Sequence, residues 1–146
     1  MNKKRKKKVI LKEIWKHFRK RQVIYLATMD SKTPRVRPVV MIHHDRKLWV
    51  LTGATNAKVY QIKQNPNFEF CLLLKGNKHS GSIRGSGKAI IIRSMSVKKE
   101  LSESIEFFKE YWNSYKDPDF CLLRLKLRQI EYVAPKMMSA VMLHVK

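Results

Sequence analysis

Three polar side chains between residues 37 and 58 have the types and spacing of a phosphate site. Arg37 is a charge within an apolar, strand-like segment, Thr52 ends the next such segment with a hydroxyl, and Lys58 falls in the first turn of a short helical stretch. The first N–H groups of a helix lack partners within it and attract anions, and a nearby lysine and arginine complete such a site. The alternative is that Arg37 and Lys58 are ordinary surface cations, and spacing alone leaves both interpretations open.

Motifs of other chemistries are missing from the sequence. It has no GxGxxG after a strand, no P-loop, no GxSxG and no HExxH. His43 and His44 are adjacent, and neighbouring strand residues point to opposite faces, so we expect no metal site there. Glu69 is the only acid in the expected sheet before Glu131, which argues against a pair of catalytic carboxylates. The pattern therefore names no catalytic residue.

Short strand-like segments must position these side chains. Strands are expected within residues 23–28, 36–44, 47–52, 67–75, 82–93 and 120–133, and helical stripes within 9–21, 57–64 and 97–108. Pro38 lacks an N–H to donate to a neighbouring strand, so we expect it at a sheet edge or a bulge. Gly85 and Gly87 predict a bulge or the close approach of another backbone or a ligand. Short strands with small inserted helices favour a mainly β fold, a compact antiparallel barrel or open sheet in one domain over 9–146.

The net charge of +21 is concentrated at the start of the chain. Residues 1–22 hold eleven lysines and arginines and one acid, Glu13. Residues 1–8 are expected to form a disordered basic tail through self-repulsion. The helical stripe of Ile10, Ile14, Trp15 and Phe18 is expected to pack on its own domain. The alternative function is a nucleic-acid or anionic-surface binding module that uses the tail and the basic face of this helix.

The two cysteines and the hydropathy pattern indicate the cellular compartment. Cys71 and Cys121 both lie in apolar runs, which is typical of buried free thiols in a reducing environment. No segment reaches the roughly 20 apolar residues that span a bilayer. Only three apolar residues follow the lysines at the start, too few for a signal peptide. We therefore expect a cytoplasmic protein.

The motifs along the chain also resemble those of a known family. The fragments appear in the order L-A-T-x-D, P-R-V-R-P-V, L-x-x-L-T, K-x-x-Q-I-x-x-N-P and I-R-G-x-G-K-A. Together they resemble the pyridoxamine 5'-phosphate oxidase-like, FMN-binding split-barrel superfamily over residues 22–93, with a weaker echo in residues 123–133. The combination is specific for the superfamily and says little about the activity.

This resemblance implies a six-stranded antiparallel split β-barrel that forms a homodimer, with FMN in clefts between the subunits. By position it implies that residues 37–41 run along the flavin and supply a phosphate-contacting arginine, that residues 51 and 52 contact the flavin, and that residues 56 and 58 form the phosphate-binding turn. Ser82 is a looser match to a further contact. The implied cofactor-binding residues are Arg37, Pro38, Val39, Val40, Met41, Leu51, Thr52, Asn56, Lys58 and Ser82.

The sequence departs from the oxidase at several points. Ile42 stands where the oxidase has a lysine that contacts the phosphate of its vitamin substrate, and Ala57 replaces an arginine. The chain also lacks the extended C-terminal region of the oxidase. It looks more like the shorter relatives, the general stress proteins and nitroimidazole-reductase-like proteins. The resemblance implies an FMN-dependent oxidoreductase or flavin-binding stress-type protein whose substrate is not pyridoxamine phosphate. Relatives also bind a deazaflavin or haem, and no sequence feature excludes the deazaflavin.

Overall fold

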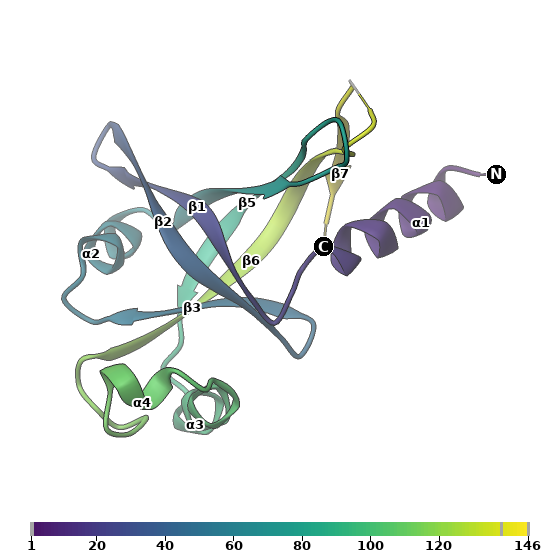
Figure 1. The fold of residues 1–146 in the computed structure, drawn as a ribbon. Helices are drawn as coiled ribbons and strands as arrows, with labels where there is room; N and C mark the ends of the chain where they lie inside the picture. Colours follow the sequence, from purple (N-terminus) through teal and green to yellow (C-terminus); the bar gives the residue numbers. More distant parts are fainter. Residues whose placement is uncertain (1, 138, 146) are drawn as a thin grey trace.

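The computed structural model describes residues 2–137 and 139–145. Within these residues, seven strands and four short helices follow one another (Figure 1). They are α1 (Lys3–Lys16), β1 (Arg21–Asp30), β2 (Thr33–His44), β3 (Lys47–Gly53), α2 (Ala57–Gln64), β4 (Asn67–Leu74), β5 (Gly81–Ile91), α3 (Met95–Ser104), α4 (Phe108–Tyr111), β6 (Phe120–Val133) and β7 (Val141–His144).

The strands form one antiparallel sheet that closes on itself. Their order is β3-β2-β1-β4-β5-β6-β7, and β3 also pairs with β6. That extra pairing joins β1 to β6 into a six-stranded barrel, while β7 adds to the outer side of β6. The predicted mainly β, antiparallel split barrel is confirmed, with the expected strands at 67–75 and 82–93 paired to each other in its wall.

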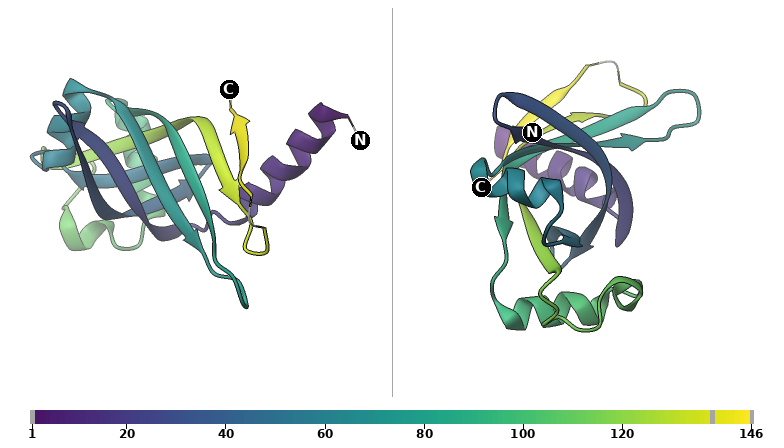
Figure 2. Two further views of the ribbon diagram at one scale, coloured as in Figure 1. Left: turned by 90° about the horizontal axis from the view of Figure 1, so that it is seen from above. Right: turned by 90° about the vertical axis from the view of Figure 1, so that its left-hand side faces the viewer.

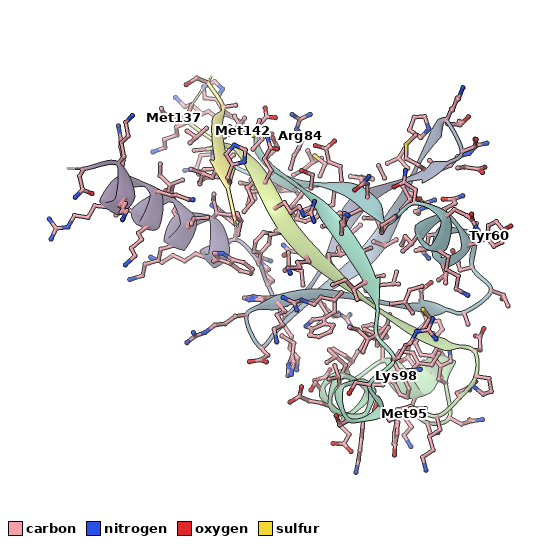
Figure 3. The ribbon with its side chains drawn as sticks, turned by 180° about the vertical axis from the view of Figure 1, so that it is seen from behind. Tyr60, Arg84, Met95, Lys98, Met137 and Met142 are labelled. Atoms are coloured by element: carbon pink, nitrogen blue, oxygen red, sulfur yellow. The ribbon has the colours of Figure 1, made fainter. Side chains whose placement is uncertain are left out.

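Alternating side chains fill the barrel and leave a second apolar cluster outside it. Phe68, Phe70, Leu72 and Leu74 of β4 are buried, and the residues between them are not. The second cluster lies where α3 and α4 pack beside β3 on the outside of the barrel (Figure 1), and it includes Trp49 of β3. Lys98 holds α3 in place by donating from Nζ to the carbonyl oxygen of Phe120, 3.0 Å away (Figure 3).

Strands β2 and β3 separate soon after the turn that joins them. They pair only from Ile42 to His44, opposite Lys47 to Trp49. Beyond this point β3 pairs with β6, while the rest of β2 pairs with β1 alone. Pro38 lies in this one-sided part of β2, opposite Tyr25 of β1, so its missing N–H costs no ladder bond on the open side. The prediction that Pro38 occupies an edge is confirmed.

The two glycines of β5 serve different geometric needs. A Cβ on Gly85 would lie 2.6 Å from side-chain carbons of Phe70 and Leu127, so this glycine makes room for the core. A Cβ on Gly87 would lie 1.9 Å from the carbonyl oxygen of Lys126, at the point where the register between β5 and β6 shifts. The structure therefore shows both a close approach and a bulge.

The start of the chain differs from expectation. We expected residues 1–8 to be disordered, and the structure continues α1 back to Lys3. Asn2 caps the helix by accepting the N–H of Arg5. Lysine and arginine are good helix formers, and the turns around Ile14 are fixed by packing on the barrel, so the helix extends from an anchored segment into the charged one. In the left view of Figure 2, α1 projects away from the barrel.

Two further sequence expectations concern thiols and membrane spans. Cys71 and Cys121 are free, the first half-buried and the second buried. Within the described part of the chain, no helix is both long enough and apolar enough to cross a bilayer.

Candidate functional site

A cavity of about 560 Å³ lies in the opening between β2 and β3. Residues 38–40 of β2 form one side, and residues 50–53 of β3 form the other. The start of β1, residues 21–23, and the segment from Phe107 to Trp112 complete the wall. Since this part of β2 pairs only with β1, its other backbone edge borders the cavity. The volume is within the range of small-molecule and cofactor pockets.

Lys58 carries a positive charge into this cavity. It lies at the second position of α2, whose first turn is capped by Asn56 through a bond from the Lys58 N–H to Asn56 Oδ1. The side chain is only 7% exposed, and its Nζ donates to Thr52 Oγ1 at 2.8 Å. None of the ion pairs among the described residues includes Lys58. The ammonium group therefore has one protein acceptor for its three donors.

The electrostatic setting of Lys58 opposes its own charge. Burial lowers the pKa of the Lys58 ammonium below its ordinary value, and the nearby Arg37 guanidinium lowers it further. Burial lowers the pKa of Arg37 as well, although a guanidinium stays protonated in proteins. The positive charges of Lys58 and Arg37 repel each other, and no ion pair among the described residues includes either of them. The site is therefore electrostatically complementary to an anion.

Arg37 belongs to a polar network behind the cavity wall. Its Nη1 donates to Thr28 Oγ1 at 2.7 Å and to the carbonyl oxygen of Leu26 at 3.2 Å, while Nη2 donates to Gln61 Oε1 at 2.7 Å. Thr28 also donates to Gln61 Oε1, at 2.6 Å. The network ties β1, β2 and α2 together and fixes the position of the helix that carries Lys58. Thr28 and Gln61 lie in motifs of the resemblance, but the sequence assigned neither a role.

The structure brings together some of the predicted cofactor residues and separates others. Those that line the cavity are Pro38, Val39, Val40, Leu51, Thr52 and Lys58. Met41 is buried in the barrel core, and Asn56 acts as the helix cap. Ser82 lies at the far end of β5, opposite Leu73 and Val133, and is not among the residues that line the cavity.

The wall formed by residues 107–112 was missed by the sequence analysis. Phe107, Tyr111 and Trp112 give this side of the cavity an aromatic face, and Glu110 adds a carboxylate. The guanidinium of Arg21, from the opposite side, lies 5.6 Å from the centre of the Phe107 ring. No motif marks these residues, and they lie far along the chain from β2 and β3. A run of aromatic residues next to acids was their only signal.

The residues of the cavity fit the phosphate of a flavin nucleotide. A buried lysine with free donors, a neighbouring hydroxyl and the first turn of α2 together make an anion site. The open edge of β2 offers backbone donors and acceptors to a planar polar ring. The donor set therefore agrees with a phosphorylated, ring-containing cofactor.

One of the comparisons with known proteins identifies the family. A family model described as pyridoxamine 5'-phosphate oxidase matches residues 10–134. No curated protein matches the chain significantly.

Solved structures are similar in fold at low sequence identity. General stress protein 26 from Bacillus anthracis has a TM-score of 0.74 and 21% identity, covering 93% of this chain and 98% of its own. A NimC/NimA family protein from Clostridium acetobutylicum has a TM-score of 0.67 and 26% identity, and the match covers 83% of this chain and 84% of that protein. A heme binding protein from Mycobacterium smegmatis has a TM-score of 0.70 and 12% identity, and the match covers 84% of this chain and 52% of that protein. With most of its length matched by the family model, the chain belongs to the pyridoxamine 5'-phosphate oxidase-like split-barrel family.

Proposed function

We propose that this protein is an FMN-binding flavoprotein that acts as an oxidoreductase. The observation that carries the proposal is Lys58, a buried cation that has no acidic partner among the described residues and opens onto a cavity of about 560 Å³. Burying an isolated charge is costly, and an anionic ligand offsets that cost. Family membership supports a flavin as the ligand.

Each part of the cavity has a role in holding the cofactor. Lys58, Thr52 and the first turn of α2 bind the phosphate, and the Arg37 network holds α2 in position. The β2 edge from Pro38 to Val40 lies along the ring. When bound, the flavin supplies one- and two-electron redox chemistry.

Haem is a less suitable ligand for this cavity. A structural neighbour is named a heme binding protein, so the comparison with that group is relevant. Haem iron takes an axial ligand, most often histidine. None of the described residues that line the cavity is a histidine, whereas a lysine suits a phosphate.

Pyridoxamine phosphate is not the substrate in this proposal. Ile42 occupies the position of the oxidase's substrate-binding lysine, and its side chain is buried against Trp49 and Leu101 in the second apolar cluster. The side chain at this position is apolar, so it offers no charge of its own to a substrate phosphate. The aromatic segment from Phe107 to Trp112 instead faces the space beside the ring.

A second copy of the chain completes the site. Val23 with Val40, and Tyr25 with Pro38, are cross-strand pairs on the outer face of β1 and β2, and Val36 extends this face. All five are exposed. Since Val23, Pro38 and Val40 also line the cavity, a copy packed on this face covers both the apolar surface and the open side of the cavity. The proposal is therefore a homodimer with the cofactor at the subunit interface.

The test is whether the purified protein binds FMN through Lys58. We expect a yellow protein with flavin absorbance, or uptake of added FMN by colourless protein with quenching of flavin fluorescence. Lys58→Ala removes a charged hydrogen bond of about 1.5–3 kcal/mol and weakens binding about 10-fold to 150-fold. Lys63→Ala, an exposed lysine of the same helix, is the matched control and keeps normal affinity.

Several outcomes contradict the proposal. Colourless protein that takes up no FMN removes its basis, and an intense haem band assigns the cavity to another cofactor. Equal losses in the Lys58→Ala and Lys63→Ala variants show that charge in general, and not the buried ammonium, attracts the ligand.

A further inference from the structure

Helix α1 begins with a dense cluster of positive charges that lies outside the cofactor site. The segment Lys3–Lys8 consists of six consecutive lysines and arginines, all exposed. The later turns attach the helix to the barrel: Ile14 is buried, and Ile10, Leu11 and Trp15 pack against the main core. The charged turns therefore extend beyond the barrel, as the left view of Figure 2 shows, and α1 lies at the end of the barrel away from α2.

The charges of Lys3–Lys8 surround the helix instead of forming one face. Successive residues of an α-helix are about 100° apart, so six consecutive positions cover the whole circumference. Helices that lie on membranes combine a charged face with an apolar one. The apolar residues of α1 lie on its later turns, and those at positions 10, 11, 14 and 15 are occupied by contacts with the barrel. A flat surface meets only one side of the charged segment, whereas a nucleic-acid groove meets several.

The protein itself does not neutralise this charge. None of the ion pairs among the described residues includes a residue of α1. Like charges three and four positions apart destabilise a helix, so the isolated segment is under electrostatic repulsion. A polyanion that binds along it relieves this repulsion.

A second group of cations lies at the foot of α1. Trp15 borders a small pocket of about 120 Å³ together with Arg46 of the β2–β3 turn, Lys47 at the start of β3, and Arg124 and Lys126 of β6. None of the described residues that line this pocket is acidic, although Lys47 Nζ lies 3.7 Å from Asp45 Oδ2 just outside it. We call these four cations the foot cluster. From Lys3 to Trp15 the helix rises about 18 Å at 1.5 Å per residue, so the two groups lie at the two ends of this stretch of α1.

We propose that α1 and the foot cluster form a binding surface for double-stranded DNA that does not depend on its sequence. The major groove of a duplex accommodates an α-helix, and phosphates follow each other closely along both of its walls. Lysines neutralise phosphates without reading bases, so affinity comes from charge and not from sequence. The surface is separate from the cofactor cavity, because none of its residues lines that cavity.

The test measures binding of a fluorescein-labelled 20-base-pair duplex to the full-length protein by anisotropy over a range of salt concentrations. In the test variant, glutamine replaces each of the six residues 3–8, which removes the charge and keeps good helix formers. In the matched control, glutamine replaces six exposed lysines elsewhere: Lys63, Lys75, Lys78, Lys88, Lys99 and Lys109. Both variants lose the same net charge. Circular dichroism verifies that both remain folded.

We expect tight, strongly salt-dependent binding by the natural protein and no preference between two duplexes of different sequence. Each phosphate contact adds about 0.9 to the slope of log affinity against log salt concentration. The test variant should lose at least about 10-fold in affinity at 100 mM salt and show a slope smaller by about 3 to 5. The control variant should change by less than about 3-fold.

Three results overturn the proposal. Equal losses in the two variants attribute binding to net charge alone. Absence of duplex binding at 100 mM salt removes the function. Tighter, α1-dependent binding to phosphatidylserine–phosphatidylcholine vesicles than to the duplex assigns the helix to a membrane surface.

Discussion

Lys58 combines a structural cost with a binding function. Its ammonium is buried, has Thr52 Oγ1 as its hydrogen-bond acceptor, and feels the charge of Arg37. An arrangement of this kind weakens the ligand-free protein and strengthens its affinity for an anion, because the ligand supplies the missing negative charge. A lysine with a purely structural role would change stability and binding in the same direction.

Replacing Lys58 with methionine separates these two effects. Methionine retains most of the aliphatic chain and removes the charge. We expect the free energy of unfolding of the cofactor-free protein to rise by about 1 kcal/mol, while affinity for FMN falls about 10-fold or more. Urea unfolding and a fluorescence titration measure the two quantities. A variant that is both less stable and weaker in binding would show that Lys58 mainly supports the fold.

The lowered pKa of Lys58 makes phosphate binding depend on pH. The ammonium must be protonated to attract the phosphate, so affinity is full below the Lys58 pKa of the free protein and falls as pH rises through it. Because burial lowers that pKa, the loss starts at a lower pH than for an ordinary lysine. The loss approaches about tenfold per pH unit.

Arginine stays protonated, so Lys58→Arg should show a flatter profile of FMN affinity between pH 7 and 10. Titrations of the ligand itself affect both proteins alike, and superimposable profiles would exclude Lys58 as the titrating group.

At the scale of elements, the close packing of β5 on β4 depends on the missing side chain of Gly85. A methyl group there would lie 2.6 Å from carbons of both Phe70 and Leu127. Overpacking of this kind costs about 1–3 kcal/mol, so Gly85→Ala should lower the free energy of unfolding by that amount. Ser86→Ala, at the neighbouring and less crowded position, is the control for urea denaturation. Equal stability of the two variants would show that the barrel wall adjusts freely.

The elements were predictable from the sequence to different degrees. Alternation of Phe68, Phe70, Leu72 and Leu74 marks β4 because one face of the strand fills the barrel. The separation of β2 from β3 was visible only through Pro38. Closure by β3 and β6 depends on pairing between segments about 70 residues apart, such as Val50 with Leu123, and no local pattern encodes it. For the same reason the aromatic wall at 107–112 could not be assigned to the cavity in advance.

The candidate site follows the same division. The sequence placed Lys58 in the first turn of a helix and Thr52 at a strand end, and the structure joins them by a hydrogen bond. Local signals were enough for each residue. The position of Arg37 relative to these two residues could not be predicted locally. Arg37 contacts α2 by a hydrogen bond to Gln61 and does not line the cavity.

For the whole molecule, the remaining question of architecture is what covers the outer face of β1 and β2. Val23, Tyr25, Val36 and Val40 are exposed there, with Val36 exposed to 68%. An apolar face of this kind next to an open cavity fits a subunit interface in which one contact stabilises the dimer and closes the cofactor site. We therefore predict that the natural protein has twice the 17.3 kDa mass of one chain in light scattering at micromolar concentration.

Val36→Glu tests this interface without altering the cavity, because Val36 is not among the residues that line it. A carboxylate in the apolar face should shift the protein toward the monomer and also weaken FMN binding, since the monomer leaves one side of the cofactor in water. Met95→Glu places the same charge on another exposed apolar side chain, on α3 (Figure 3), and should leave mass and affinity unchanged. A natural protein that is monomeric and binds FMN at full affinity would show that a single barrel encloses the cofactor. A Val36→Glu variant that remains dimeric would place the interface on a different face, and the exposed β1–β2 surface would then need another partner.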